Sequence, residues 1–371
     1  MNRKLQDKLN AVCPYYTMFP LQFPKAVLKQ VSRDTTVFDP FCGRGTTNFA
    51  AQSLNIVSYG FDTSPVAVAI AKAKLAVTDA SEVLDLMEQL LCDFQSPEIP
   101  EGEFWRWAFH PDTLIDICKL RQGLMEIEDT DASVMLRAVL MGCLHGPLNK
   151  NKQAPSYFSN QMPRTFATKP EYSVRYWKQR NLKPHYVNVR IPVKKKIEGL
   201  FNKVPRRSYI SNIQQADSRQ PHYYRILDRP VDLVITSPPY YGMQSYIQDQ
   251  WLRYWFIGGS DTIDYQAGKE TSHFSPERFA RSLTKVWDNI FNKSSDRIRM
   301  IIRFGAIASR KADYDEILRN SLKQSVGSWH IYYTRNAGSS NRGNRQAQVM
   351  GKRVKSSAIE EKDYFVRLHP S

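Results

Sequence analysis

The sequence predicts an α/β fold with a doubly wound parallel sheet that is interrupted by a helical and basic insertion. Short strand-like runs alternate with helical patterns over residues 36–76, and this alternation returns after residue 207. Between them, residues 77–207 show helical patterns and a basic segment without a strand. We therefore expect residues 1–76 and 208–371 to form one domain, which residues 77–207 leave and re-enter.

The first part of the predicted sheet contains two strands, each followed by a helix. Ser64 and Pro65 are typical of the N-cap and the first residue of a helix, which supports the second of these helices. In chain order we expect a strand at 36–38, a glycine turn at 39–47, a helix at 48–54, a strand at 56–61 and a helix at 66–76.

The predicted insertion begins with helices and ends in a basic segment. We expect helices at 82–91 with Ser81 as its cap, at 111–125 and at 132–144. Residues 150–207 contain 15 Lys and Arg and two acidic residues, with aromatic residues interleaved and no long helical periodicity. This combination favours contact with phosphates and bases, and the alternative is a solvated basic surface.

Strand and helix patterns return in the second part of the predicted sheet. In chain order we expect a strand at 209–215 followed by Asp217 and Ser218, a strand at 233–235, a helix at 276–291 after the cap Ser275, a strand at 297–304, a helix at 314–324 and strands at 329–334 and 363–368. Trp251, Trp255 and Phe256 have helical spacing, and we assign them to a core.

Composition indicates the class of partner. The formal net charge is +16 and the isoelectric point is about 9.5, which favours a polyanion, usually nucleic acid. The five cysteines form no metal-binding spacing, so we expect no metal site and a reducing compartment. No window has the apolar length of a membrane span or a leader, and we expect a cytoplasmic protein without a membrane partner.

The turn after the first strand has the composition of a ligand-binding loop. Gly43 and Gly45 allow a tight turn, and the helix that follows can receive an anion at its N-terminus. Asp39 adds a fixed negative charge, so a ligand with both a cation and a carboxylate fits. Asp62 suits ribose hydroxyls, and the GRGTTN run lacks the third glycine of a dinucleotide fingerprint. The alternative is a glycine turn with a helix-capping aspartate.

A second candidate motif follows the strand at 233–235. Pro238 and Pro239 cannot extend a central strand, because proline lacks a backbone N–H and has a fixed φ. The strand must therefore end in a rigid corner that carries Ser237 and Tyr240. Asp217 and Ser218, after the strand before it, suit an adenine amino group or simply end that strand.

Together these motifs resemble the S-adenosylmethionine-dependent amino-methyltransferases of DNA, which methylate cytosine N4 or adenine N6. The resemblance covers ordered motifs over about two thirds of the chain. The run DPFCGRGTT at 39–47 is similar to the family's cofactor loop, GFDTSP at 60–65 to its ribose-binding turn, and TSPPY at 236–240 to its catalytic motif. PYYTMFP at 14–20 is similar to the segment that closes over the cofactor.

The resemblance implies a Rossmann-like methyltransferase sheet, S-adenosyl-L-methionine as cofactor, and two sets of site residues. The implied catalytic residues are Ser237, Pro238, Pro239 and Tyr240. The implied cofactor-binding residues are Tyr16, Phe19, Asp39, Pro40, Phe41, Gly43, Gly45, Thr46, Asp62, Thr63, Ser64, Asp217 and Ser218.

The chemistry explains the serine. An exocyclic amine is a poor nucleophile, and hydrogen-bond acceptors on its N–H groups free its lone pair. We expect Ser237 and Pro238 to accept these bonds, and Tyr240 to stack on a base that has left the duplex. In the family, serine at this position is usual for cytosine N4, whereas Asp or Asn dominates for adenine N6. Methylation of cytosine C5 needs a cysteine, which this corner lacks.

Double-stranded DNA is the expected partner, with the region 77–207 as its target-recognition region. The expected contacts are Lys150, Lys152, Arg164, Arg175, Lys178, Arg180, Arg335, Arg342 and Arg345. The leading hypothesis is a site-specific cytosine-N4 methyltransferase of a restriction-modification or phage-defence system, with a cognate restriction endonuclease as a further partner and a monomer or dimer as its state. The alternatives are an adenine-N6 methyltransferase, an RNA base methyltransferase and an inactive DNA-binding subunit.

Overall fold

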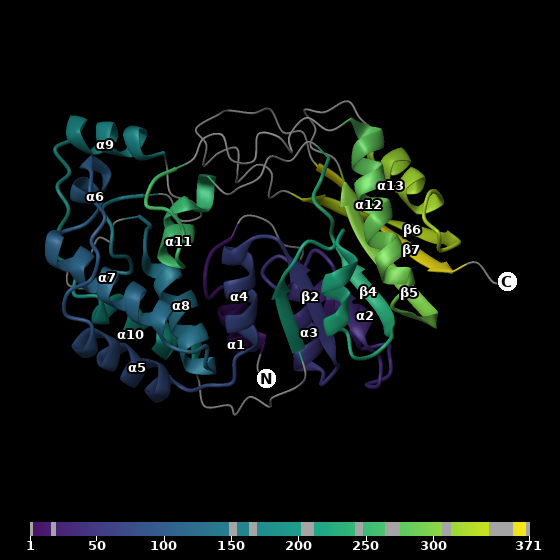
Figure 1. The fold of residues 1–371 in the computed structure, drawn as a ribbon, viewed down its shortest axis with the longest axis horizontal. Helices are drawn as coiled ribbons and strands as arrows, with labels where there is room; N and C mark the ends of the chain where they lie inside the picture. Colours follow the sequence, from purple (N-terminus) through teal and green to yellow (C-terminus); the bar gives the residue numbers. More distant parts are fainter. Residues whose placement is uncertain are drawn as a thin grey trace. The chain divides into compact units, whose positions relative to one another are not determined.

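The computed structural model describes residues 3–15, 20–147, 154–162, 169–201, 211–241, 248–263, 275–305, 313–340 and 359–368. The chain divides into two compact units, and each is described by itself (Figure 1). The helical unit comprises Met1–Met18, Pro65–Ser208 and Tyr246–Tyr265. The sheet unit comprises Phe19–Ser64, Tyr209–Ser245 and Gln266–Ser371.

The sheet unit contains a seven-stranded sheet in the order β3-β2-β1-β4-β5-β7-β6. The strands are β1 (Val37–Asp39), β2 (Ser58–Asp62), β3 (Ser211–Gln215), β4 (Val231–Thr236), β5 (Ser294–Gly305), β6 (Trp329–Ser340) and β7 (Ile359–Leu368). The five strands from β3 to β5 are parallel, whereas β7 is antiparallel to both of its neighbours. This arrangement confirms the predicted α/β fold class.

The strand order reverses between β1 and β4. The chain builds β1, β2 and β3 outward in one direction, and then returns to place β4 and β5 on the other side of β1. Such a topological switch point is where doubly wound sheets bind ligands, at the carboxyl ends of the strands. The predicted cofactor loop follows β1 and the predicted catalytic corner follows β4, so both lie at this point.

One face of the sheet is covered by α12 (Pro276–Phe291) and α13 (Tyr314–Lys323), which lie side by side in Figure 1. The hydroxyl of Ser275 accepts a hydrogen bond from the Arg278 N–H and so caps α12, as its sequence predicts. Apolar side chains from both helices pack on alternate residues of the strands, including Phe38, Met300 and Tyr364. Burial of this continuous core is the main stabilising contribution to the unit.

The other face is covered near its centre by α2 (Gln22–Leu28) and α3 (Thr46–Ser53). The hydroxyl of Thr47, in α3, donates to the carbonyl of Ile235, in β4, at 3.1 Å. The Phe23 ring of α2 lies 4.0 Å from the guanidinium of Arg303, in β5. Helices α2 and α3 therefore cover this face of the sheet from β1 across β4 to β5.

The helical unit is built from α1 (Arg3–Asn10), α4 (Pro65–Leu75), α5 (Ala80–Asp93), α6 (Glu103–Ala108), α7 (Pro111–Glu126), α8 (Asp131–Cys143), α9 (Pro170–Gln179), α10 (Arg190–Leu200) and α11 (Trp251–Phe256). The predicted core residues Trp251, Trp255 and Phe256 are buried, and the two tryptophans pack around Trp105. Within the described part of the chain, no helix has the length and apolar content that a membrane crossing requires.

Several sequence expectations differ from the structure in detail. Asp79, not Ser81, caps α5, because its carboxylate accepts the Glu82 N–H in a capping box. The basic stretch does contain helices, α9 and α10, each of which buries a short apolar side such as Val174 and Trp177. Strands β6 and β7 are longer than expected, because the polar residues at their ends still pair with each other.

The domain ranges stay a prediction. The compact helical unit contains the predicted insertion, but it also includes segments 1–18, 65–76 and 246–265, which we assigned to the sheet. Helix α4 explains part of this difference, since it packs on α8 within the helical unit.

Candidate active site

A hydrogen bond joins the two predicted motifs at the switch point. The hydroxyl of Thr236, the last residue of β4, donates to Oδ1 of Asp39, the last residue of β1, at 2.6 Å. The two strands are paired with Phe38 opposite Val234, so their ends lie at the same edge of the sheet. The cofactor loop and the catalytic corner are therefore immediate neighbours within the sheet unit.

Asp39 is a buried acid with an unusual pKa. Burial is the largest cause and raises the pKa to about 7, against the hydrogen bonds that Oδ1 accepts from the Thr236 hydroxyl and the Phe41 N–H, which favour the charged form. Its second oxygen, Oδ2, is buried and has no hydrogen-bond partner among the described residues. The fixed negative charge that the sequence predicts is thus replaced by a group that titrates near neutral pH.

The glycine turn is held against the next strand. Gly43 and Gly45 have φ values of +51° and +66°, in the left-handed region that glycine adopts without strain. The Gly43 N–H donates to the Asp62 carboxylate at 2.9 Å, and the Cys42 N–H donates to the carbonyl of Phe61 at 2.9 Å. The turn thus brings the ends of β1 and β2 together.

Asp62 has a structural task in addition to its predicted contact with ribose. Its two oxygens accept the backbone N–H groups of Gly43 and Ser64, at 2.9 and 2.8 Å. Burial is the main cause that raises its pKa, and these two hydrogen bonds oppose the rise. The residue as a whole is half-buried, and both of its carboxylate oxygens are engaged by the turn.

The Ser218 side chain is engaged by the chain itself. Its hydroxyl donates to the carbonyl of Pro40, which attaches the end of β3 to the cofactor loop. Asp217 is half-buried and paired with Arg219, whose hydrogen bonds lower the pKa of the Asp217 carboxyl. Of the two residues Asp217 and Ser218, which the sequence predicts to contact an adenine amino group, Asp217 is therefore the one whose side chain would make this contact.

The catalytic corner leaves β4 directly. Ser237 is half-buried, Pro238 is buried and Pro239 is exposed. The hydroxyl of Tyr240 donates to the carboxylate of Glu361, in β7. The Tyr240 ring meets the Phe304 ring edge to face, with centroids 6.0 Å apart and an angle of 86° between the rings.

The surroundings of Tyr240 keep its hydroxyl protonated. Burial is the largest cause that raises its pKa above the usual range, followed by the charge and the hydrogen bond of Glu361. Hydrogen bonding by Ser237 to the same hydroxyl acts in the opposite direction. Ser237, Tyr240 and Glu361 thus form one connected polar group at the corner.

Glu361 was missed by sequence reasoning, and so was the role of Thr236. Glu361 is 121 residues from Tyr240 in the chain and lies before the segment 363–368 that we expected as a strand. The usable signal for Thr236 was its place directly before Ser237, at the end of an apolar run. For Glu361 the sequence offers no local signal, because an acidic residue in a polar segment is ordinary.

The other predicted cofactor residues lie in the same part of the sheet unit. Pro40 and Phe41 lie in the turn after β1, and Thr46 is the first residue of α3. Thr63 is exposed and directly follows β2. Tyr16 and Phe19 lie outside the described residues.

The predicted DNA contacts fall in both units. Arg175 and Lys178 are exposed on α9 of the helical unit, where Lys178 pairs with Glu103. Arg180, also exposed, is the residue directly after α9, and its guanidinium lies 4.1 Å from the Tyr176 ring. Arg335 is on β6 of the sheet unit. Lys150, Lys152, Arg164, Arg342 and Arg345 lie outside the described residues.

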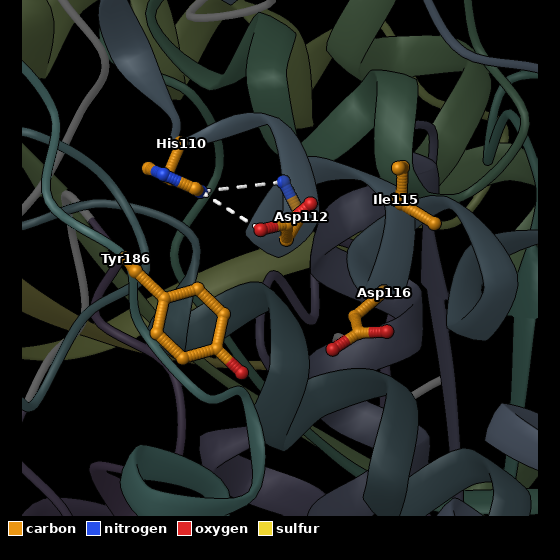
Figure 2. Close-up of a pocket in the computed structure, with 5 residues that line it drawn as sticks. All are labelled: His110, Asp112, Ile115, Asp116 and Tyr186. Atoms are coloured by element: carbon orange, nitrogen blue, oxygen red, sulfur yellow. Dashed lines mark hydrogen bonds and ion pairs between the residues drawn. The ribbon is translucent and has the colours of Figure 1, made fainter.

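Surface hollows occur among the described residues of the helical unit. Figure 2 shows the first, of about 470 Å³, where the Tyr186 ring and His110 face Asp112 and Asp116 of α7. His110 Nδ1 lies 3.6 Å from the Asp112 carboxylate. The second hollow, of about 330 Å³, lies between α6 and α9 and is lined in part by Arg175 and Lys178. Neither hollow contains a residue of the predicted catalytic or cofactor sets.

Residues 2–73 match the family model described as DNA methylase. This match confirms the predicted family resemblance. The matched segment contains the predicted cofactor loop and the predicted ribose-binding turn, and it ends well before the predicted catalytic corner. A methyltransferase with S-adenosylmethionine as its cofactor is therefore supported. No curated protein matches the chain.

Several solved structures are similar to the chain at low identity. The rRNA methyltransferase aviRa from Streptomyces viridochromogenes has 10% identity and a TM-score of 0.34, with 99% of this chain and 94% of that chain covered. An rRNA methylase from Streptococcus thermophilus has 6% identity and a TM-score of 0.36, with 95% and 99% covered. An S-adenosylmethionine-dependent methyltransferase from Clostridium acetobutylicum has 8% identity and a TM-score of 0.31, with 94% and 90% covered.

Proposed function

We propose that this protein transfers a methyl group from S-adenosyl-L-methionine to the exocyclic N4 amine of a cytosine that has been flipped out of duplex DNA. The observation that carries the proposal is the 2.6 Å hydrogen bond between Thr236 and Asp39. It makes the loop typical of a cofactor site and the corner typical of amine activation neighbours at one switch point. A methyl group can be transferred only between sites that are this close.

The residues of the loop fit the cofactor. Asp39 presents a buried oxygen that receives no hydrogen bond from the part of the chain that the structure describes, and a cationic amine of the ligand is a donor of the required charge. The turn at Gly43 leaves open space where a side chain would otherwise lie. When bound, S-adenosylmethionine supplies an electrophilic methyl group. Asp39, Asp62 and Asp217 are the acceptors with which the chain would hold it.

The corner can activate the amine. The Ser237 oxygen and the Pro238 carbonyl are acceptors on one rigid segment, and two prolines limit its reorganisation. Hydrogen bonds from the two N–H groups of the amine to these acceptors localise its lone pair on nitrogen. The nitrogen then becomes nucleophilic before it is deprotonated, and the proton that the methylated amine must lose would pass along these hydrogen bonds to solvent.

Tyr240 and Glu361 support this arrangement. A Ser237 hydroxyl that donates to Tyr240 directs its oxygen lone pairs away from the tyrosine and toward the substrate side. Tyr240 is itself fixed, because its hydroxyl donates to Glu361 and its ring packs on Phe304. In this role Glu361 is a positioning residue, and the Tyr240 ring is the stacking partner of the base.

Cytosine and DNA are the finer parts of the proposal. Serine in place of an acidic or amide residue at position 237 supports cytosine N4, and the DNA methylase match supports DNA. The region 77–207, which includes the exposed cations of helix α9, is the proposed target-recognition region. We further propose that the protein is cytoplasmic and associated with DNA. It would act in a restriction-modification or phage-defence system, together with a cognate endonuclease.

The test is methyl transfer to defined nucleic acids. The full chain is incubated with labelled S-adenosylmethionine and with random-sequence duplex DNA or structured RNA, and the products are digested to nucleosides. Label in N4-methylcytosine from DNA is expected. Label in N6-methyladenine alone contradicts the choice of base, and label in RNA alone contradicts the choice of DNA.

A variant separates chemistry from binding. Ser237→Ala should lower the rate by roughly 100-fold while the Kd for the cofactor stays unchanged, since one activating group is lost. Full activity of Ser237→Ala would contradict the proposal that Ser237 activates the amine. A folded wild-type protein that binds no cofactor in calorimetry would favour the inactive DNA-binding subunit.

A further inference from the structure

Aromatic and basic side chains gather on the sheet face opposite α12 and α13, at its β5-β7-β6 end. Strand pairing places Arg299, Arg367 and His330 in one row across these strands, and Phe365 beside Tyr333 in the next row. Tyr332 and Tyr333 are 43% and 53% exposed, although aromatic rings are usually covered. The residues Arg299, Tyr332, Tyr333, Arg335, Phe365 and Arg367 are called the aromatic–arginine face below.

A β-bulge creates the aromatic part of this face. The pairing of β6 with β7 shifts between Ile331 and Tyr333, so that Tyr332 is an extra residue. As a result, both tyrosines reach the same ring: Tyr332 and Tyr333 lie 6.3 and 5.2 Å from Phe365 between centroids. Regular alternation would have directed one of the two tyrosines to the opposite face.

The arginines are fixed around these rings. The Arg367 guanidinium lies 5.2 Å from the Tyr332 ring, and the Arg335 guanidinium lies 5.7 Å from the Phe365 ring. Arg335 is also held by the buried carboxylate of Asp363, at 2.9 Å, while half of its side chain stays exposed. The cations are thus pre-oriented beside the rings, which lowers the entropy cost of binding an anion.

Two of the cations are placed at a cost to stability. Arg299 and Arg367 are direct cross-strand partners, both are exposed, and like charges at such positions repel. Asp363, the acid between the strands, is already bonded through both oxygens to Arg303. An anionic ligand would remove the repulsion between Arg299 and Arg367, because it binds both.

We propose that the aromatic–arginine face binds single-stranded DNA, with bases stacked on its rings and phosphates on its arginines. Unpaired strands expose base faces, whereas duplex DNA buries them in its stack, so exposed rings beside fixed cations suit a single strand. The choice of DNA over RNA rests on the proposed function. The bulges at Ile331/Tyr333 and Asn336/Gly338 disturb the edge of β6, which disfavours the addition of a protein strand there.

This binding site is separate from the catalytic corner. Glu361, which contacts Tyr240, and Phe365 are both in β7, four residues or about 13 Å apart along the strand. Arg367 lies a further two residues away. The proposed strand is therefore not the flipped base itself but a neighbouring unpaired segment.

The test measures binding of a fluorescein-labelled oligothymidylate of about 20 nucleotides, longer than the roughly 4–16 nucleotides that one stacking surface covers. Fluorescence anisotropy gives Kd with the full chain and no cofactor. Tyr332→Leu/Tyr333→Leu should raise Kd by roughly 5- to 100-fold, and Tyr332→Phe/Tyr333→Phe should bind like the wild type, since phenylalanine keeps the rings. Equal Kd values for the leucine variant and the wild type overturn the proposal.

The arginines have their own readout. Arg299→Ala/Arg367→Ala should reduce the slope of log Kd against log salt by about 0.7 for each phosphate that the variant no longer neutralises. Arg281→Ala/Lys323→Ala is the matched control, because these exposed cations belong to α12 and α13 on the opposite face. An equal change of slope in both pairs means a general charge effect and overturns the site.

Further outcomes distinguish other occupants. Loss of affinity for RNA but not for DNA in the leucine variant, or a change only in its oligomeric state, overturns the proposal in favour of RNA or of a second copy. Methyl transfer to duplex DNA is measured in parallel. If the wild type transfers no methyl group while the leucine variant still loses oligothymidylate binding, the proposed function fails and the binding site stands.

Discussion

The hydroxyl of Thr236 donates a 2.6 Å hydrogen bond to the carboxyl group of Asp39, although the two residues are 197 positions apart in the chain. This bond stabilises the ionised form of an acid that burial pushes toward neutrality. It also fixes the position of the cofactor loop relative to the catalytic corner. One contact thus controls both the charge and the geometry of the candidate active site.

Thr236→Val should weaken cofactor binding. Valine has the shape of threonine but no hydroxyl, so the ionised form of Asp39 loses a buried hydrogen bond, a loss of about 1.5–3 kcal/mol. We expect the Kd of S-adenosylmethionine to rise by roughly 10- to 100-fold in calorimetry. Thr236→Ser keeps the hydroxyl and should bind like the wild type, and equal affinities in all three proteins would contradict this role of Thr236.

Asp39 should make stability depend on pH. Its pKa of about 7 in the folded protein exceeds the value of 3.8 expected when unfolded, so the protonated acid stabilises the fold at low pH. This contribution is lost as pH rises from about 4 to 7, with a slope of about 1.4 kcal/mol per pH unit. Between pH 5 and pH 8 the free energy of unfolding of the wild type should therefore fall by about 3 kcal/mol more than that of Asp39→Asn.

Urea unfolding of both proteins at several pH values measures this difference. Asp62 has the same direction of shift and is present in both proteins, so its own contribution largely cancels. If the free energy of unfolding of the wild type and of Asp39→Asn changes with pH in parallel, Asp39 has an ordinary pKa.

Glu361→Leu should lower kcat without weakening substrate binding. Loss of the acceptor frees the Tyr240 hydroxyl and the Ser237 hydroxyl that it orients, and misplacement of such groups costs roughly 10- to 100-fold in rate. Single-turnover methyl transfer and separate binding curves measure the two effects. Glu361→Gln keeps an acceptor oxygen and should restore most of the rate.

Tyr240→Phe provides a cross-check on the same contact. It should lose about as much rate as Glu361→Leu, and the double variant should lose little more, because both substitutions remove one interaction. Additive losses would mean that Glu361 acts on the reaction by another route.

Gly43→Ala should destabilise the protein by about 1–2 kcal/mol through backbone strain alone. Its φ is +51°, and an added Cβ would meet no atom of the described residues within 4 Å. Gly199→Ala is the matched control, because this glycine also has open space but lies in helix α10, where alanine stabilises by about 1 kcal/mol. Thermal unfolding midpoints should thus shift in opposite directions, and a shift of Gly43→Ala toward higher temperature would refute the strain.

Local patterns predicted most elements of the fold. The apolar runs before Asp39, Asp62 and Ser237 are β1, β2 and β4, and the Ser275–Pro276 start of α12 is where its cap chemistry placed it. Such signals depend on a few adjacent residues, so the sequence contains them completely. The ends of β6 and β7 were missed, since polar residues there are ordered only by pairing with the other strand.

The sequence by itself determined the fold class, the glycine turn and the rigid corner with Ser237, because each depends on residues that are neighbours in the chain. Only the tertiary structure decided that burial gives Asp39 a pKa near neutrality, that Glu361 holds Tyr240, and that a bulge places two tyrosines beside Phe365. The physical reason is that desolvation and side-chain contacts depend on which distant segments pack together. Sheet topology sets that packing, and no short stretch of sequence encodes it.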